Sequence, residues 1–168
     1  SCKYLSEPLL FFKGFKSLQS HRVASWLWEN SRHTLAHYFQ SRTSEVYGVD
    51  IHPAAKLGKG IMIDHGTGVV IGETSVIKDN VSIFQGVTLG GTGKETGDRH
   101  PKVMEGVLLS ASSTVLGNVQ IGRNAKIAAG SVVLEDVKEG TTVAGVPAKE
   151  VSQAVDNVPA DDIDHLIE

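Results

Sequence analysis

Residues 69–89 read VVIGETSVIKDNVSIFQGVTL, and the large aliphatic residues in this stretch recur every six positions. The anchors of the repeat are Ile71, Ile77, Ile83 and Leu89. A period of six fits neither a free α-helix, whose side chains repeat every 3.6 residues, nor a plain strand, whose side chains alternate. It is the period of a parallel β-helix, in which each flat face of the coil carries one hexapeptide.

The six-residue period extends on both sides of this stretch. Further anchors are Ile51, Leu57 and Ile63 before it, and Leu109, Val115, Ile121, Ile127 and Val133 after it. Small or β-branched residues recur four positions after the anchors, as at Val81 and Val87. We expect the anchors to point inward and stack, with coils about 4.8 Å apart. The low aromatic content of 6% agrees, because a narrow prism has room for Ile and Val rather than Trp.

One segment interrupts the repeat. The anchors stop at Leu89 and resume at Leu109, twenty residues later, which equals three hexapeptides plus two. A loop over 90–106 is therefore expected to leave the coil and rejoin it. Its GGTGK segment (90–94) fails the phosphate-binding Walker pattern, since Thr88 and Glu95 stand where that pattern needs Gly and Ser or Thr. Long loops inside a compact fold are usually functional.

The first 48 residues have a different period, with apolar residues three and four apart, which is typical of amphipathic helices. We expect a helical hairpin that buries its aromatic side chains, with breaks at Gly14 and at Asn30–Ser31 and with Ser31 capping the second helix. The predicted organisation is a helical segment over 1–48, a β-helix over 49–151 that includes the 90–106 loop, and a C-terminal tail over 152–168.

Composition excludes several classes of function. The chain has 168 residues and a formal net charge of −3, with no Lys/Arg cluster of the kind that binds nucleic acid. It has no apolar run long enough to span a membrane and no signal-peptide pattern. Its single cysteine, Cys2, cannot form an internal disulfide, which suits a reducing compartment, so we predict a cytoplasmic protein.

Residues capable of chemistry gather in the repeat region and its loop. His65 follows Asp64, and Arg99 and His100 lie in the loop, while Asp50 comes shortly before His52. Each histidine alone could be a solvated surface group, but together the set suits a general base, an orienting carboxylate and an anion clamp. A zinc site is disfavoured because no pair of repeat histidines lies five apart, and Cys2 has no neighbouring His to activate it.

Four motifs resemble the bacterial serine acetyltransferases: DIHP (50–53), DHGTG (64–68), GGTGK with GDRHPK (90–102) and VAGVPAK (143–149). The resemblance covers about residues 4–151. It implies a mainly β fold, a left-handed parallel β-helix preceded by an α-helical segment. It also implies acetyl transfer from acetyl-CoA to the hydroxyl of L-serine, in cysteine biosynthesis.

The same resemblance implies a role for each candidate residue. His65 would be the general base and Asp50 would orient it. Asp64 would bind the substrate ammonium, and Arg99 with His100 would bind the carboxylate. Positions similar to those that contact acetyl-CoA in the family are Gly91, Thr92, Ala111 and Ala129, with Lys126 and Lys149 as candidates for its phosphates. No metal is implied.

The family's active site lies between neighbouring chains of a trimer, and a longer N-terminal helical region pairs trimers into hexamers. L-cysteine is expected as a feedback inhibitor that competes with serine. The chain departs from the family at Ser110–Ala111–Ser112, where Gly-Ala-Gly is usual. The family's tail often ends in Ile, which docks into cysteine synthase, whereas this chain ends in Leu166-Ile167-Glu168.

Two alternatives stay open at this point. One is a hexapeptide acetyltransferase for a different hydroxyl acceptor, although Asp64 and the Arg99–His100 pair favour a zwitterionic acceptor. The other is an inactive assembly module that binds cysteine synthase, although the intact Asp50 and His65 pair argues for catalysis.

Overall fold

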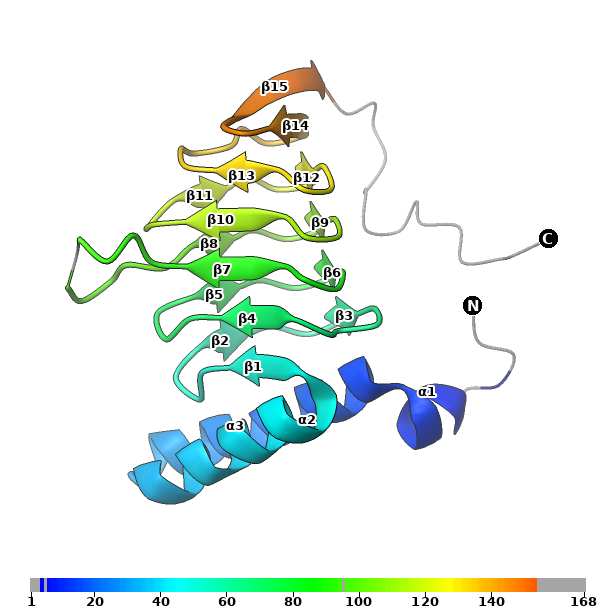
Figure 1. The fold of residues 1–168 in the computed structure, drawn as a ribbon, viewed down its shortest axis with the longest axis vertical. Helices are drawn as coiled ribbons and strands as arrows, with labels where there is room; N and C mark the ends of the chain where they lie inside the picture. Colours follow the sequence, from blue (N-terminus) through cyan, green and yellow to red (C-terminus); the bar gives the residue numbers. More distant parts are fainter. Residues whose placement is uncertain (1–3, 5, 95, 154–168) are drawn as a thin grey trace.

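A computed structural model describes residues 4, 6–94 and 96–153 of the chain, so Cys2 and the predicted tail beyond Gln153 lie outside the described residues. Three helices come first and a coiled stack of short strands follows (Figure 1). The helices are α1 (Ser6–Phe11), α2 (Lys13–Glu29) and α3 (His33–Tyr47). The strands are β1 (Val49–Ile51), β2 (Lys56–Leu57), β3 (Met62–Ile63), β4 (Val69–Ile71), β5 (Val76–Ile77), β6 (Ser82–Ile83), β7 (Thr88–Gly90), β8 (Lys102–Val103), β9 (Leu108–Leu109), β10 (Thr114–Leu116), β11 (Gln120–Ile121), β12 (Lys126–Ile127), β13 (Val132–Val133), β14 (Thr141–Gly145) and β15 (Ala148–Gln153).

The strands form the three faces of a parallel β-helix, which confirms the predicted fold class. The first sheet has the order β1-β4-β7-β10-β13, the second β11-β8-β5-β2 and the third β15-β14-β12-β9-β6-β3. From β1 to β13, consecutive strands along the chain fall in different sheets, so each coil supplies one strand to each face. Pairing within the faces is parallel, apart from the antiparallel β14–β15 pair at the last coil.

The hexapeptide anchors line the inside of the prism, as expected. Ile71, Ile77 and Ile83 are almost completely buried, and Ile71 is in register with Leu89 one coil later. Leu57 is an exception, because it is only partly buried at the edge of the core. Full burial of one such side chain contributes about 1.5–3 kcal/mol, so the stacked anchors are the main source of stability in this region.

The coil resumes earlier than the anchors predict. Strand β8 pairs with both β5 and β11, and its Val103 is fully buried in register with Ile77. The excursion therefore runs only between Gly90 and Lys102, which corrects the predicted 90–106 loop. The physical reason is that a two-residue strand is enough to rejoin the second sheet and to bury one anchor.

The helices form a base under the first coil (Figure 1). Helix α2 begins at Lys13, so Gly14 is inside the helix and the predicted break at this position is wrong; the chain breaks at Phe12. A side chain at Gly14 would place a Cβ 2.0 Å from the carbonyl oxygen of Ile63, so glycine permits close contact with the coil. The predicted cap is also wrong, because Ser31 has a φ of 60° and Arg32 precedes α3.

The buried face of α2 includes the small residues Gly14, Ser17 and Ala24. Trp26 on α2 and Tyr38 on α3 are 58% and 60% exposed, so the prediction that the hairpin buries its aromatic side chains fails for both. The same face also buries Leu18, His21 and Leu27, so it is the two named aromatic side chains that lie away from the coil. No helix in the described part of the chain is long and apolar enough to cross a membrane.

Candidate active site

The predicted site residues lie at two different corners of the prism. His65 lies in the turn that leads from β3 into β4, whereas Arg99 and His100 lie in the excursion after β7. Because β4 and β7 are neighbouring parallel strands, these positions are at opposite ends of the first sheet (Figure 1). The four residue steps from Gly68 to Gly72 span about 13 Å at roughly 3.3 Å per residue. A single chain therefore keeps His65 apart from Arg99 and His100.

His65 is presented to solvent by a tight turn. Its backbone has a φ of 55°, in the left-handed region, and its side chain is 74% exposed. Its Nε2 lies 3.9 Å from Oδ2 of Asp64, so the turn carries an imidazole beside a carboxylate. The N-terminus of α2 supports the turn, since the Lys13 ammonium donates a hydrogen bond to the hydroxyl of Thr67. The exposed imidazole can accept a proton from a molecule bound at this corner.

Asp50 lies on the outer side of β1, half-buried. In the described part of the chain its hydrogen-bond partner is the amide of Gln40, with Nε2 donating to Oδ1 over 2.7 Å, and it makes no hydrogen bond to His65. The carboxylate thus faces the first sheet between the two corners. The orienting role predicted for Asp50 stays a prediction.

Thr74 organises the corner that holds Arg99 and His100. Its hydroxyl oxygen accepts the backbone N–H groups of Arg99, at 3.0 Å, and of His100, at 3.1 Å. The same hydroxyl lies 2.9 Å from Nδ1 of His100, and the backbone N–H of Thr74 donates to that nitrogen at 3.2 Å. Because Nδ1 accepts a backbone N–H, the proton of the neutral ring is on Nε2.

His100 is only 7% exposed, so it is not the solvated group that its polar surroundings suggested as an alternative. Burial is the main cause that lowers its pKa below the usual value, and the charge of Arg99 adds to the effect. The ring packs on the backbone of Gly72, where a Cβ would lie 2.0 Å from the ring carbon Cδ2. Gly72 is thus required for this placement of His100, which is held neutral with an N–H donor at Nε2.

Arg99 is paired with a residue that the sequence did not single out. Its Nη2 lies 2.6 Å from Oε2 of Glu73, and this hydrogen bond is the main reason why the pKa of the Glu73 carboxyl is below its usual value. Asp98, the neighbour of Arg99 in sequence, pairs with Lys102 at 2.5 Å instead. Glu73 and Thr74 follow Gly72 at the end of β4, so they lie one coil away from the start of the excursion. Only the register of the first sheet could have indicated this proximity.

The residues predicted to contact acetyl-CoA are divided between the corners. Ala111 and Ala129 lie in the turns that precede β10 and β13, in the same column as the His65 turn. Backbone hydrogen bonds join this column: Gly86 N to Thr67 O at 2.9 Å, Ser112 N to Gln85 O at 2.8 Å and Gly130 N to Ala111 O at 2.9 Å. Gly91 and Thr92 lie at the Arg99 corner, and the two lysines are exposed, Lys126 on β12 and Lys149 on β15.

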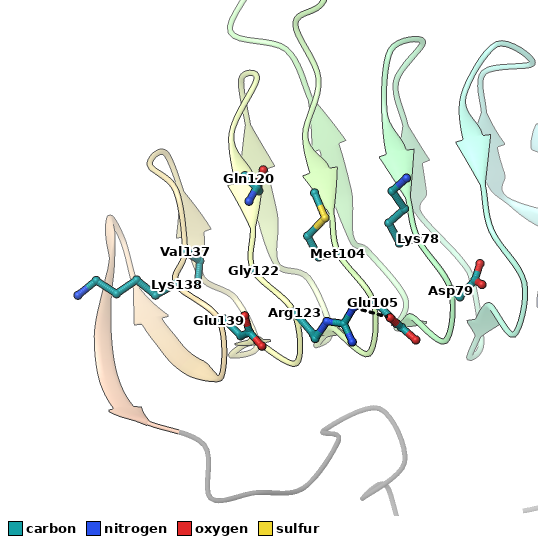
Figure 2. A pocket seen from close by; sticks show the side chains of 10 residues that line it. All are labelled: Lys78, Asp79, Met104, Glu105, Gln120, Gly122, Arg123, Val137, Lys138 and Glu139. Atoms are coloured by element: carbon teal, nitrogen blue, oxygen red, sulfur yellow. Dashed lines mark ion pairs between the residues drawn. The ribbon is translucent and has the colours of Figure 1, made fainter.

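The third corner, between the second and third sheets, holds an open groove that contains none of the predicted residues. It is lined by residues such as Lys78, Met104 and Lys138 (Figure 2). Opposite charges meet within it, as where Nη2 of Arg123 lies 3.0 Å from Oε2 of Glu105. It therefore shows no excess charge that would select a ligand. In the described residues no group of three His, Cys, Asp or Glu side chains is arranged to hold a metal ion.

A family model described as bacterial transferase hexapeptide (six repeats) matches residues 100–135. The chain is 56% identical over 159 residues to a curated serine acetyltransferase of Salmonella typhimurium, and the match covers 95% of this chain and 58% of the relative. The chain thus spans little more than half the length of that relative.

Solved structures agree with this similarity. A serine acetyltransferase of Brucella abortus in complex with coenzyme A superposes with a TM-score of 0.91 at 53% identity, over 92% of this chain and 62% of that one. A serine acetyltransferase in complex with cysteine superposes with a TM-score of 0.95 at 55% identity, over 99% of this chain and 65% of that one. The similarity includes both corners and the helical base.

Proposed function

Because the chain belongs to the serine acetyltransferase family, we propose that it transfers the acetyl group of acetyl-CoA to the hydroxyl of L-serine, in cysteine biosynthesis. The observation that carries the proposal is the pair of complementary corners, one with an exposed base beside a carboxylate and one with a fixed cation beside an N–H donor. The relatives solved with coenzyme A and with cysteine support the same two classes of ligand.

The reaction needs a base because a serine hydroxyl is a poor nucleophile. His65 takes the hydroxyl proton as the oxygen attacks the thioester carbonyl, and Asp50 stabilises the imidazolium that forms. The tetrahedral intermediate then collapses with cleavage of the carbon–sulfur bond, and the imidazolium returns the proton to the departing thiolate of CoA. The products are O-acetyl-L-serine and CoA.

The acceptor is recognised by its two charges. Asp64 binds the ammonium, and Arg99 binds the carboxylate together with the Nε2–H of His100. L-Cysteine carries the same two charges and differs only at the reacting atom, so it competes for this site as an inhibitor. A hexapeptide acetyltransferase for an uncharged hydroxyl acceptor is the second candidate, but such an acceptor would make no use of the charges of Asp64 and Arg99.

The donor lies along the column of turns that begins at His65. The small side chains of Ala111 and Ala129 leave room for the pantetheine arm, although Ser112 stands where the family usually has Gly. Gly91 and Thr92 close the site from the neighbouring chain. Lys126 and Lys149 lie on the last coils, where they would meet the phosphates of CoA. No metal takes part in this mechanism.

The site requires two chains, because the corners are about 13 Å apart within one. We therefore propose a homotrimer in which the His65 corner of one chain meets the Arg99 corner of the next. A form with a longer N-terminal helical region would assemble as a hexamer. A cytoplasmic location and docking to cysteine synthase through the tail stay predictions.

His65→Ala tests the proposal directly. Release of the CoA thiol is measured with acetyl-CoA and a panel of acceptors: L-serine, L-homoserine, a sugar alcohol and an aminoglycoside. We expect the wild type to be active with L-serine and the variant to lose roughly 10²–10⁴-fold, with an unchanged unfolding temperature. Wild-type turnover in His65→Ala, or a preference for an uncharged acceptor, would contradict the proposal.

A further inference from the structure

The last turns of α3 lie beside the strand that carries Asp50. Gly48, with a φ of 68°, ends α3 in the left-handed conformation and turns the chain directly into β1. Because the chain reverses direction at this point, the side chain of Gln40 on α3 lies beside that of Asp50 on β1, ten residues later. The amide Nε2 of Gln40 lies 2.7 Å from Oδ1 of Asp50, and its Oε1 lies 3.1 Å from Nδ1 of His37.

The directions of these hydrogen bonds are determined by chemistry. An ionised carboxylate only accepts, so the NH₂ group of Gln40 must face Asp50. The carbonyl of the same amide then faces His37, whose Nδ1 must carry a proton in order to donate. The amide is thus held at both ends and has a single orientation.

His37 is itself held in place by packing. Its ring centroid is 5.2 Å from that of Trp28 on α2 and 5.6 Å from that of His52, which follows β1. The Trp28 ring also packs against His52 at 5.1 Å. The relay from His37 through Gln40 to Asp50 therefore rests on both long helices and on the first coil.

We propose that Gln40 is a positioning residue for acetyl transfer, which acts by holding Asp50. By engaging Oδ1, the amide restricts rotation of the carboxylate and leaves Oδ2 available to an imidazole. This inference rests on the proposed function, since it gives the helical base a part in catalysis through Asp50. It predicts an effect on turnover rather than on substrate binding, because Gln40 is not among the residues that we propose to bind either substrate.

The test uses Gln40→Met, which keeps the length of the side chain and removes the hydrogen bonds. We expect kcat to fall about 10-fold, equivalent to roughly 1.4 kcal/mol, while the KM values for L-serine and acetyl-CoA stay within about twofold. Gln40→Glu, which sets a carboxylate against Asp50, should lower kcat further. The matched control is Gln19→Met on the exposed side of α2, which should be indistinguishable from wild type.

A double-mutant cycle separates positioning from general damage to the fold. In an Asp50→Ala background, Gln40→Met should have no further effect on kcat, because the group that it positions is gone. Equal losses in both backgrounds, or a raised KM with unchanged kcat, would overturn the inference. If the wild-type enzyme is active with L-serine and Gln40→Met is equally active, only the positioning role fails; if wild type does not acetylate L-serine, the proposed function fails first.

Discussion

The two corners of the first sheet are built in opposite ways. At one corner a short turn holds His65 out in solvent beside the partly buried Asp64, supported by a hydrogen bond from Lys13. At the other corner, Thr74 binds the backbone and ring of the residues that end the excursion, and His100 is buried. The first corner is open and the second is internally bonded.

In the proposed shared site, this contrast indicates which corner gains more from the neighbouring chain. An open corner gains its surroundings when another chain covers it, whereas the bonded corner already has its donors in place. A shared site built in this way would bring a prearranged anion clamp to an exposed base. Groups that are already fixed lose less conformational entropy when a ligand binds to them. The rigidity of the Arg99 corner should therefore favour binding of the serine carboxylate.

The largest predicted effect is recovery of activity by mixing two inactive variants. His65→Ala and Arg99→Ala each damage a different corner, so a site formed between chains can be intact when the two are combined. In randomly mixed trimers about a quarter of the sites would combine both wild-type corners. Co-refolding the two variants and measuring thiol release should therefore restore roughly 25% of wild-type activity. Recovery no greater than the sum of the separate variants would mean that each chain contains its own site.

The second effect is the loss of the clamp. Arg99→Ala should lower kcat/KM for L-serine by roughly 30- to 1,000-fold, while the KM for acetyl-CoA changes little. Arg99→Lys should recover only part of this loss, because an ammonium cannot reproduce the planar guanidinium. The matched control is Arg123→Ala, which breaks the exposed pair with Glu105 at the third corner and should leave kinetics unchanged. If Arg99→Ala weakens both substrates equally, the loop has been disordered and the clamp is wrong.

The third effect is a pH dependence of stability where α2 meets the coil. Burial lowers the pKa of His21 on α2 to about 4, against the effect of its hydrogen bond with the backbone of Ala55, while Arg22 and His52 lower it further. The unfolded chain therefore takes up a proton near pH 6.5 that the folded chain does not bind, so this contribution is present above pH 6.5 and is lost as the pH falls toward 4.

Between pH 7 and pH 5, His21 should account for a loss of about 2 kcal/mol in the free energy of unfolding. His21→Gln removes the titrating group, so its stability should fall less steeply over this range, whatever its stability at pH 7. Urea unfolding at several pH values measures both slopes. Parallel slopes for wild type and variant would show that His21 is not the responsible group.

The smallest effect is that of the Thr74 hydroxyl. Thr74→Val leaves the N–H groups of Arg99 and His100 without their acceptor, which should cost about 1–2 kcal/mol of stability and a several-fold loss in kcat/KM for L-serine. Thr142→Val on β14 is the control, because its side chain is half-exposed on the outside of the last coil. Thermal unfolding of the two variants should differ, and equal midpoints would show that Thr74 does not organise this corner.

The coil was predictable because each anchor contributes independently to one repeating pattern. Val103 was missed although it lies six residues before Leu109, because it is fourteen residues after Leu89 and therefore out of phase with the earlier anchors. Exposure of Trp26 and burial of His21 were not predictable, since both depend on which face of α2 meets the coil.

The candidate site divides in the same way. His65, Arg99 and His100 were predicted as site residues from residue type and motif, and those motifs are local. Glu73 and Thr74, which contact Arg99 and His100, were not, because these contacts join residues about 26 positions apart through the register of neighbouring coils. Gln40 was missed for a related reason: its contact with Asp50 depends on how Gly48 turns α3 back along β1.

The column of turns that begins at His65 also has a fixed spacing along the axis of the β-helix. Hydrogen bonds tie each turn to the next, so the turns of Thr67, Gln85, Ala111 and Ala129 are separated by steps of about 4.8 Å. If the donor lies along this column, its length is measured in coils, and three such steps bring Ala129 about 14 Å from the His65 turn. Residues 109–126 make up one complete coil, because Leu109 is in register with Ile127. Duplicating them would insert one whole coil before Ala129. This would move the far end of the donor site by about 4.8 Å without changing either corner.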